Sequence, residues 1–414
     1  MQINGWAEEI RNLGGIIFIK LHTTSGDIQI TLPKKKISRE VFELAEKITR
    51  QSALSVTGEI KNNKEAPGGK EIIPKKIEVL NFAETPLPLE PSEKTPAELE
   101  TRLDWRFLDF RTEKSLTIFK IQNEILRSFR ELLIKEGFLE IQPPCIISSA
   151  SEGGADLFKV PYFEKEAYLA QSPQLYKQMC AISFGKVFTI VPVWRAEKFN
   201  KPTHLNEIRQ MDIEMAFVKS EEDVMKVLEK VFVYILKSVQ KNCKNQLKSL
   251  KRELKIPKIP LKRITYTQAV ESLNKSGEKM EWGNDFSKLQ EEKLSKIFGN
   301  AFFVKEWPCK IKAFYTMPYE EDKKICRAFD LIYDGLEIAS GTQRIHIPDL
   351  LIRRIRESGL KPEDFKYYID CFRYGAPPHS GFSFGLERIT MTITGMKNIR
   401  ECCMFPRDRN RLTP

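Results

Sequence analysis

Two carboxylates on either side of a predicted hairpin turn are the residues of this chain best placed for chemistry. Asp334-Gly335 separates two apolar, β-prone runs and predicts a type I′ turn, which needs positive φ at both central residues. Counting back from that turn, Asp330 faces Ala339, so Asp330 and Glu337 become diagonal neighbours on one face. Diagonal Cβ atoms lie roughly 7 to 8 Å apart. Such a pair can hold a hard cation such as Mg²⁺ beside nucleotide phosphates, although a solvated sheet face is the alternative.

Further polar residues follow on the second strand of this hairpin. Ser340 and Arg344 come after Glu337, but strict alternation turns both of them to the opposite face. A single site that uses all of these residues therefore requires a β-bulge, which we expect near Gly341.

A second candidate for phosphate binding is Arg388. It follows Gly381-Phe-Ser-Phe-Gly385, where an apolar strand with small residues runs into a helix. An arginine at such a junction can present its guanidinium fork to phosphate. The alternative for the two glycines is close strand packing.

Composition indicates an ordinary globular protein with a basic surface. Apolar residues make up 41% of the 414 residues, and no stretch approaches about 18 uninterrupted apolar residues, so we expect no membrane span. The N-terminus has no secretory signal, and we expect a cytoplasmic protein. Eight cysteines without a Cys-x-x-Cys pair and only four histidines indicate packing thiols rather than a transition-metal site. The net charge of +11 is compatible with a nucleic-acid partner or simply with a basic surface.

Residues 1–82 show β alternation and predict an OB-type barrel of five strands and one helix. The helix is expected between Ser38 and Arg50. On such a barrel, Phe18 can stack on a base and Gln29 can read a base edge. A single phenylalanine in a strand can also belong to the core.

The rest of the chain predicts a linker, residues 83–105 with four prolines, and a larger domain, residues 106–414, of mixed α+β class. A helix with an apolar stripe precedes Gly137, and another begins after Ser220 as its N-cap. The basic stretch 241–258 is either a solvated face or an RNA contact. The polar residues 259–312 have weak periodicity and predict nothing definite.

Together these residues resemble the class II aminoacyl-tRNA synthetases of subclass IIb, specifically the aspartyl enzymes of archaeal and eukaryotic type. The resemblance covers nearly the whole chain. It rests on the helix and strand ending at Pro144, Ser151-Glu-Gly-Gly, Gln171-Ser-Pro-Gln-Leu-Tyr-Lys, Arg195-Ala-Glu, the 330–344 hairpin, Gly385-Leu-Glu-Arg388 and Phe405-Pro-Arg-Asp-Arg-Asn-Arg-Leu-Thr-Pro.

This resemblance implies a six-stranded antiparallel catalytic sheet flanked by helices, and an N-terminal OB-fold domain that binds the anticodon. The expected reaction is ATP- and Mg²⁺-dependent: L-aspartate attacks the α-phosphate of ATP, and the aspartyl group then passes to tRNA(Asp). Such chemistry needs positioning and charge neutralisation rather than a nucleophilic side chain. A homodimer through residues 116–137 and the strand ending at Pro144 is also implied.

The resemblance also implies roles for individual residues. The catalytic pair is Arg195 on the α-phosphate and Arg388 on the γ-phosphate. The other expected residues are Glu197, His204 and Glu337 for ATP; Asp330, Glu337 and Ser340 for Mg²⁺; Glu152, Gln174, Lys177, Ser340 and Arg344 for aspartate; and Arg11, Phe18, Gln29 and Pro67 for the anticodon.

Three features depart from the family pattern. The chain starts shortly before Gly5-Trp6, so we expect an incomplete barrel edge, and Ile208 stands where many class II enzymes carry an adenine-stacking phenylalanine. Glu8 and Pro67 stand where strict archaeal enzymes carry tryptophan and lysine and relaxed ones carry histidine and proline. Pro67 therefore predicts that tRNA(Asn) is charged as well, although Pro67-Gly68-Gly69 is also ordinary turn chemistry.

Other functions of the same fold are open. An asparaginyl-tRNA synthetase would share the fold and metal site, and a free-standing asparagine synthetase would lack the anticodon domain. A non-catalytic RNA-binding paralogue would lose its phosphate ligands, which argues against it here, since Arg195, Asp330, Glu337 and Arg388 are all present. Lys177 and Arg344 favour aspartate, because an amide would leave these two cations uncompensated.

Overall fold

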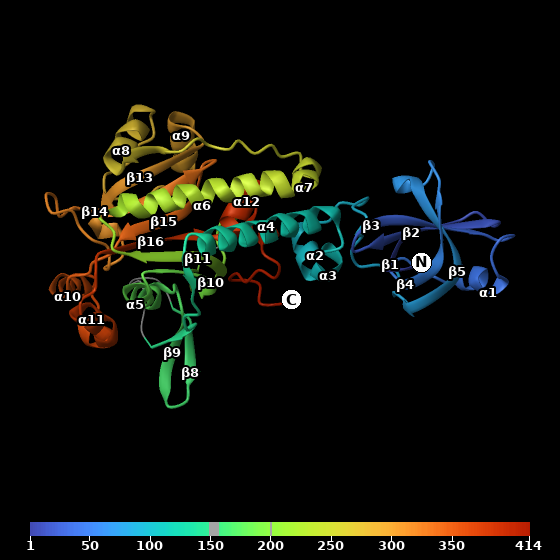
Figure 1. The fold of residues 1–414 in the computed structure, drawn as a ribbon, viewed down its shortest axis with the longest axis horizontal. Helices are drawn as coiled ribbons and strands as arrows, with labels where there is room; N and C mark the ends of the chain where they lie inside the picture. Colours follow the sequence, from blue (N-terminus) through green and yellow to red (C-terminus); the bar gives the residue numbers. More distant parts are fainter. Residues whose placement is uncertain (149–156, 199–200) are drawn as a thin grey trace. The chain divides into compact units, whose positions relative to one another are not determined.

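The computed structural model describes residues 1–148, 157–198 and 201–414, which form two compact units, residues 1–113 and 114–414 (Figure 1).

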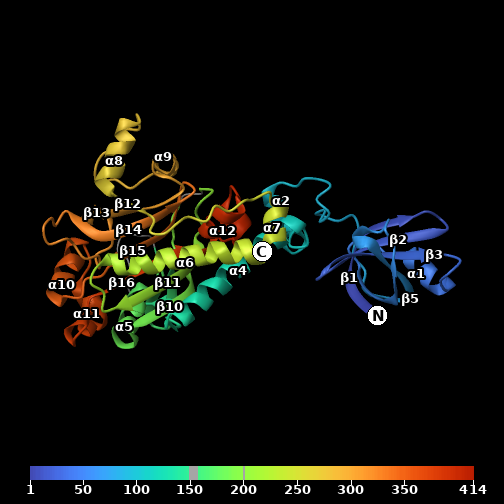
Figure 2. The same cartoon turned by 45° about the horizontal axis from the view of Figure 1, so that its top comes forward.

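Unit 1 contains a closed five-stranded barrel with strand order β1-β2-β3-β5-β4, which confirms the predicted OB-type fold (Figure 2). The barrel elements are β1 (Gln2–Asn12), β2 (Ile16–Thr23), β3 (Gly26–Pro33), α1 (Arg39–Ala45), β4 (Ala53–Asn62), the 3-10 turn η1 (Pro67–Gly69) and β5 (Lys70–Asn81). β1 pairs with both β2 and β4, so the expectation of an incomplete barrel edge is wrong.

The proline-rich segment after β5 packs against the barrel within unit 1. Thr49 Oγ1 donates a hydrogen bond to the Ala83 carbonyl over 2.6 Å, and Lys94 forms an ion pair with Glu9 over 2.6 Å. The segment ends in two short helices, α2 (Leu99–Asp104) and α3 (Arg106–Asp109).

Unit 2 is built on an eight-stranded sheet with strand order β12-β13-β14-β15-β16-β11-β10-β6. The six central strands are antiparallel, as predicted, while β12 and β6 add parallel pairs at the two edges. The strands are β6 (Leu139–Glu140), β10 (Lys186–Trp194), β11 (Glu207–Ala216), β12 (Lys262–Thr265), β13 (Ala301–Pro308), β14 (Ile325–Tyr333), β15 (Leu336–Gln343) and β16 (His379–Gly385). A separate sheet holds β7 (Ile146–Ile147), β8 (Lys159–Tyr162) and β9 (Lys165–Leu169).

Helices cover this sheet on both faces. The main core joins the sheet to α4 (Glu113–Lys135), α6 (Glu221–Asn242) and α12 (Leu386–Thr394). A second cluster involves α8 (Tyr266–Lys275) and α9 (Lys288–Phe298), and a third joins α5 (Gln174–Phe184), α10 (Pro348–Glu357), η3 (Pro362–Phe365) and α11 (Lys366–Arg373). The remaining elements are α7 (Lys244–Ser249), η2 (Cys309–Ile311) and η4 (Ile399–Cys402).

The apolar stripe of α4 faces the chain's own core. Ile121, Ile125, Phe129 and Leu132 are buried among residues of the sheet and α6. A partner subunit would therefore have to contact other residues of this helix.

The hairpin of β14 and β15 forms the predicted turn at Asp334-Gly335, but the register of its two strands differs from the prediction further from the turn. Asp334 and Gly335 have φ values of 50° and 78°, and Ile332 pairs with Glu337. Beyond this point the register shifts, so that Asp330 faces Ser340 rather than Ala339. The required bulge is therefore present at Ile338 and not near Gly341, and it returns Ser340 to the face of Glu337.

In the part of the chain that the structure describes, no helix is long and apolar enough to span a membrane. All eight cysteines are free thiols, and Cys243, Cys309, Cys326 and Cys402 are buried, as expected of packing residues.

Candidate active site

Two adjoining pockets lie on the face of the sheet that carries Glu337 and Ser340. Both are lined by Arg195, Gln210, Glu337, Ser340 and Ser383, so any molecules bound in them would meet at these residues. The inner pocket, of about 300 Å³, also contains Ser172, Gln174, Lys177, Asp212, Lys312, Tyr315, Thr316, Thr342 and Arg344. The outer pocket also contains Glu197, Thr203, His204, Leu205, Ile208, Gly385, Glu387, Arg388 and Ile399.

Four buried charges form the floor of the inner pocket. Lys177 on α5 places Nζ 2.7 Å from Asp212 Oδ2 and 3.6 Å from Glu214 Oε2. Arg344, just after β15, bonds Glu214 through Nε to Oε1 and through Nη2 to Oε2, each over 3.0 Å. The expectation that an amide substrate would leave these two cations uncompensated is therefore wrong, because two acids of β11 already balance them.

The local packing keeps Glu214 ionised. Burial alone would raise the pKa of Glu214, but the charges of Arg344 and Lys177 lower it below its ordinary value. Gly381 on the adjacent strand makes room for this carboxylate, because a Cβ there would lie 2.2 Å from Glu214 Oε2.

A buried hydrogen-bond network positions α5 beside these charges. Gln178 Oε1 accepts from Gln174 Nε2 over 2.9 Å and from the Tyr368 hydroxyl over 2.8 Å. The Gln178 amide nitrogen lies 2.8 Å from His379 Nε2. Burial lowers the pKa of His379 to about 4, so its ring is neutral at neutral pH and can accept this bond.

Three buried side-chain oxygens lining the inner pocket have no hydrogen-bond partner among the described residues: Gln210 Oε1, Asp212 Oδ1 and the Thr316 hydroxyl. The first two can only accept. An unsatisfied buried acceptor is costly, so this pair is suited to a ligand that brings N–H donors, such as an ammonium group.

The outer pocket is lined by two arginines, Arg195 and Arg388. Arg388 lies at the start of α12, with Nη1 3.2 Å from the Glu337 carbonyl and 3.7 Å from Glu337 Oε1. Burial and, to a smaller extent, the charges of Arg388, Lys201 and Arg195 lower the pKa of His204 to about 4. His204 is therefore neutral at neutral pH, and the two arginines supply the positive charge.

Ile208 lines the same pocket and packs against an apolar cluster with Leu205 and Ile399. These side chains offer an apolar wall in place of the stacking phenylalanine that the sequence lacks.

Four carboxylates interact with one another beside the two pockets: Asp285, Glu291, Asp330 and Glu337. Asp330 Oδ2 accepts an ion pair from Lys312 over 2.8 Å, and Glu291 Oε2 accepts a hydrogen bond from the Glu337 backbone over 3.1 Å. Burial and the neighbouring Glu337 charge raise the pKa of Glu291 to about 8. Burial also raises the pKa of Asp285 and of Asp330, although the Lys312 ammonium opposes both shifts.

This donor set fits a hard divalent cation. All the oxygens are carboxylates or the Ser340 hydroxyl, and Asp330 Oδ1 is buried without a hydrogen-bond partner among the described residues. Burial is the main cause of the raised carboxylate pKa values, and repulsion between neighbouring acids adds to it, so a bound cation would stabilise the ionised forms.

Sequence reasoning brought most of this site together but missed several members. It missed Gln210, Asp212, Glu214, Asp285, Glu291 and Lys312. The signal for β11 was available, since Gln210, Asp212 and Glu214 alternate with buried Met211 and Ile213. Asp285 and Glu291 belong to the segment of weak periodicity and gave no signal.

On the barrel, three of the expected anticodon residues share one outward face. Phe18 pairs with Arg11 on β1 and with Thr31 on β3, whereas Ile17 and Ile19 point into the core. Phe18 is thus half-buried and outside the core, and Gln29 lies on the same face, bonded to Thr31 and Glu71. The backbone of Pro67–Gly69 forms a single 3-10 turn, as turn chemistry predicts.

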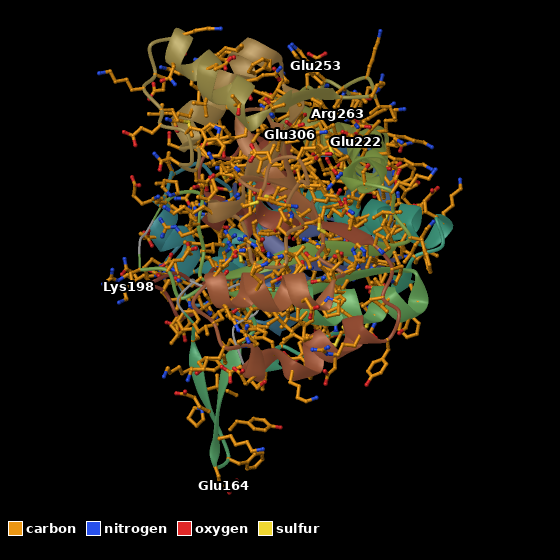
Figure 3. All side chains as sticks on the ribbon, turned by 90° about the vertical axis from the view of Figure 1, so that its left-hand side faces the viewer. Glu164, Lys198, Glu222, Glu253, Arg263 and Glu306 are labelled. Carbon is orange, nitrogen blue, oxygen red and sulfur yellow. The ribbon has the colours of Figure 1, made fainter. Side chains whose placement is uncertain are left out.

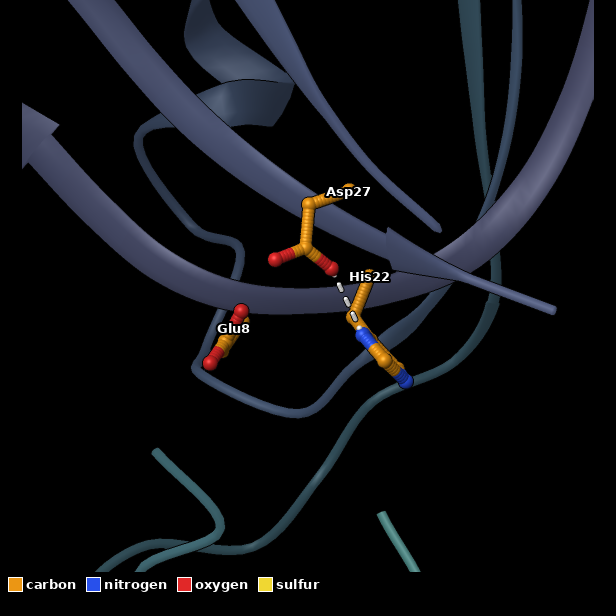
Figure 4. A group of neighbouring side chains, drawn as sticks. All are labelled: Glu8, His22 and Asp27. Carbon is orange, nitrogen blue, oxygen red and sulfur yellow. Dashed lines mark hydrogen bonds and ion pairs between the residues drawn. The ribbon is translucent and has the colours of Figure 1, made fainter. Parts of the chain in front are cut away.

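Glu8, at the position expected to read the anticodon, belongs to an ion cluster on this face. Glu8, His22 and Asp27 point toward one another, with their possible ligand atoms within 4.8 Å (Figure 4). Lys20 Nζ lies 2.7 Å from Glu8 Oε2 and 2.9 Å from Asp27 Oδ2, so an ammonium already neutralises both acids. The His22 hydrogen bond and the Lys20 charge lower the pKa of Asp27 to about 2.

One expected site residue, Glu152, lies outside the described residues.

A family model described as "tRNA synthetases class II (D, K and N)" matches residues 98–409, and a model described as "OB-fold nucleic acid binding domain" matches residues 1–80. The chain belongs to the class II aminoacyl-tRNA synthetases. Members of this family use ATP.

Sequence relatives cover this synthetase end to end. An "Aspartate--tRNA(Asp/Asn) ligase" of Methanopyrus kandleri is 50% identical over 100% of this chain and 96% of the relative. A protein of the same description from Archaeoglobus fulgidus is 48% identical over 99% and 95%.

Solved structures of two specificities share the fold. The asparaginyl-tRNA synthetase of Pyrococcus horikoshii with asparaginyl-adenylate superposes with a TM-score of 0.95 at 35% identity, covering 100% of this chain and 96% of that one. The aspartyl-tRNA synthetase of Entamoeba histolytica gives 0.88 at 33% identity, covering 100% and 90%. Fold similarity therefore does not separate aspartate from asparagine as the substrate.

Proposed function

We propose that this synthetase ligates L-aspartate to tRNA through an aspartyl-adenylate, with ATP in the outer pocket and aspartate in the inner one. The observation that carries the proposal is the junction of the two pockets at Arg195, Glu337 and Ser340. Reacting groups held on either side of these residues would meet in the geometry that lowers the entropic part of the barrier.

Aspartate would be held at three places in the inner pocket. Its side-chain carboxylate faces Lys177 and Arg344, which have only donors, while Asp212 Oδ1 and Gln210 Oε1 accept from its ammonium group. Its α-carboxylate is then free to point toward Arg195. Gln174 supports this arrangement by fixing Gln178 and α5. We propose that Glu152 also contacts the substrate.

In the first step an α-carboxylate oxygen forms a bond to the α-phosphorus of ATP while the bond to the pyrophosphate oxygen breaks. Arg195 neutralises the α-phosphate, and Arg388 holds the γ-phosphate end. Glu197 and the neutral His204 supply further polar contacts to the nucleotide. In the second step the terminal 3′-hydroxyl of tRNA attacks the aspartyl carbonyl and AMP leaves.

Mg²⁺ is the cation that the carboxylate set suits best. Asp330 and Glu337, with Ser340, would hold it, and it would supply charge neutralisation to the phosphates. Glu291 lies next to Glu337, and Asp285 lies next to Asp330.

Two further proposals concern partners. The relatives' description, tRNA(Asp/Asn), together with Pro67, supports charging of tRNA(Asn) as well as tRNA(Asp), with Arg11, Phe18 and Gln29 contacting the anticodon. We also propose a homodimer, as in the resembling family.

The test is aspartate-dependent ATP–pyrophosphate exchange, followed by charging of purified transcripts. The expected result is exchange with aspartate and Mg²⁺, abolished in Arg195→Ala and Asp330→Asn. Equal exchange with asparagine would overturn the amino-acid assignment, and no exchange with either amino acid would overturn the reaction.

A further inference from the structure

Most of the net charge of this protein is concentrated in one short segment. Residues 237–262 contain nine lysines and arginines against a single acid, Glu253, so this segment carries +8 of the total net charge of +11. Its core is a group of lysines spaced alternately by four and three residues, here called the lysine patch: Lys237, Lys241, Lys244, Lys248, Lys251, Lys255 and Lys258.

All seven lysines of the patch are exposed. No ammonium group of the patch has a hydrogen bond or ion pair to any residue among 1–148, 157–198 and 201–414. The basic residues next to the patch differ in this respect. Arg252 donates to the carbonyls of Thr392 and Ile393, and Arg263 pairs with Glu222 (both labelled in Figure 3).

Buried residues next to the lysine patch fix the backbone that carries the lysines. Lys237 and Lys241 are on the last turns of α6, whose opposite side buries Leu236 and Val239. Lys244 and Lys248 are on α7, which is anchored by the buried Leu247.

The chain then turns back and is fixed beside α6. Gln240 Nε2 donates to the Leu254 carbonyl over 3.2 Å, and Leu254 is buried in the main core. Lys251, Lys255 and Lys258 therefore flank a point of the chain that is fixed beside α6, and binding through them would cost no refolding of the backbone.

The chemistry of the patch favours a phosphate backbone over a lipid surface. Peripheral membrane binding needs apolar side chains that insert beside the basic ones. Between Lys237 and Lys258 the large apolar residues are buried or partly buried, and the exposed residues are lysine, asparagine, glutamine, serine and the single acid Glu253. Lysine ammonium groups act as point charges that neutralise phosphates without reading bases.

We propose that the lysine patch binds the sugar-phosphate backbone of the tRNA substrate, at a site separate from the anticodon face of the barrel and from the two pockets. The proposal rests on the proposed function for the identity of the RNA. Contacts of this kind add affinity that is independent of base sequence and strongly dependent on salt.

The experiment uses the full chain with four patch lysines replaced: K237Q, K241Q, K244Q and K248Q. The control replaces four lysines that already have carboxylate partners and so removes the same charge: Lys159, Lys226, Lys230 and Lys366, each to glutamine. The tRNA dissociation constant is measured by filter binding between 50 and 200 mM KCl, and pyrophosphate exchange is measured without tRNA.

The expected result is a loss of affinity of about tenfold or more at 150 mM salt and a decrease of about three in the slope of log Kd against log salt for the patch variant. The control should keep the slope of the unmodified protein, and both variants should keep pyrophosphate exchange. Equal slopes for the patch variant and the control would overturn the proposal.

A second arm measures sedimentation with vesicles containing phosphatidylserine. Loss of vesicle binding with unchanged tRNA binding would assign the patch to membranes and overturn the proposal. If the unmodified protein has no exchange activity, the proposed function fails, whereas a patch-dependent salt slope with any folded RNA would still support an RNA-binding surface.

Discussion

Lys177 Nζ lies 2.7 Å from Asp212 Oδ2, and the two side chains are 2% and 1% exposed. Together with Arg344 and Glu214, they form a buried set of two cations and two acids whose charges balance one another. We therefore expect discrimination between aspartate and asparagine to depend on hydrogen-bond type rather than on surplus positive charge at these residues. Lysine and arginine offer donors only, so the NH₂ of an amide would meet donors with donors.

The first prediction follows from the fact that Lys177 and Arg344 offer only hydrogen-bond donors. In pyrophosphate exchange, kcat/KM for aspartate should exceed that for asparagine by about 100-fold, which corresponds to about 2.7 kcal/mol. Lys177→Gln supplies an acceptor for the amide and should reduce the ratio to below about tenfold. It should also lower kcat/KM for aspartate, because Asp212 loses its partner, at a cost of about 3 to 5 kcal/mol.

The matched control for this substitution is Lys159→Gln, whose lysine is at the surface beside Glu166. An unchanged aspartate preference in Lys177→Gln would show that Lys177 does not select the side chain of the amino-acid substrate.

The second prediction concerns Glu291, which accepts a hydrogen bond from the backbone of the proposed metal ligand Glu337. Its pKa is raised to about 8, above the ordinary 4.5, so the folded protein keeps a proton that the unfolded chain loses over this range. Without Mg²⁺, stability should therefore fall as the pH rises from about 4.5 to 8. Glu291→Gln, which mimics the protonated acid, should raise the melting temperature relative to the unmodified protein at pH 8 and hardly at all at pH 5.

A Mg²⁺ titration of exchange activity tests the positioning role of the same residue. Glu291→Gln keeps an acceptor for the Glu337 backbone and should stay within about threefold of the unmodified protein at pH 7. Glu291→Ala removes this acceptor, at about 1 kcal/mol or more, and should need more Mg²⁺ for half-maximal rate. Identical Mg²⁺ curves for the two variants would contradict the role.

The third prediction concerns the homodimer. Since the apolar stripe of α4 is internal, the exposed aliphatic residues near its end are the better candidates: Ile134 is 60% exposed, and Leu139, on the edge strand β6, is 50% exposed. Light scattering at micromolar concentration should give the mass of a dimer, and Ile134→Asp with Leu139→Asp should give a monomer. Dimers that persist in this double variant would place the interface elsewhere, and a monomeric unmodified protein would exclude the dimer.

The fourth prediction concerns the anticodon. Two transcripts that differ only at the third anticodon position should be charged with kcat/KM values within about tenfold. The reason is that Pro67 has neither a backbone N–H nor a charge to offer a base, and Glu8 is neutralised by Lys20. Pro67→Lys should raise the preference for the aspartate anticodon. A preference of two orders of magnitude in the unmodified protein would contradict relaxed reading.

How far the sequence predicts the site depends on the range of the interactions. The Asp334-Gly335 turn is a local signal, so the diagonal placement of Asp330 and Glu337 could be predicted from it. Alternation could also show that a bulge was necessary. It could not place the bulge, because packing against the neighbouring strand chooses the position.

Site residues that are distant in sequence could not be predicted from such local patterns. Glu291 reaches Glu337 across 46 positions of sequence, and Lys312 reaches Asp330 from outside the sheet. Asp212 and Glu214 followed a visible alternation, but only the tertiary structure shows that their side of β11 is buried against Lys177 and Arg344.

The bulge at Ile338 also determines which change of length β15 can tolerate. An in-frame loss of that one codon would place Ala339 directly after Glu337, so the pairs of Ala339 with Leu331 and of Ser340 with Asp330 would be kept in a regular ladder. Ser340 and Thr342 would therefore stay on the face of the pocket. Deletion of this codon should cost the burial of one aliphatic side chain in the main core rather than the arrangement of the polar residues.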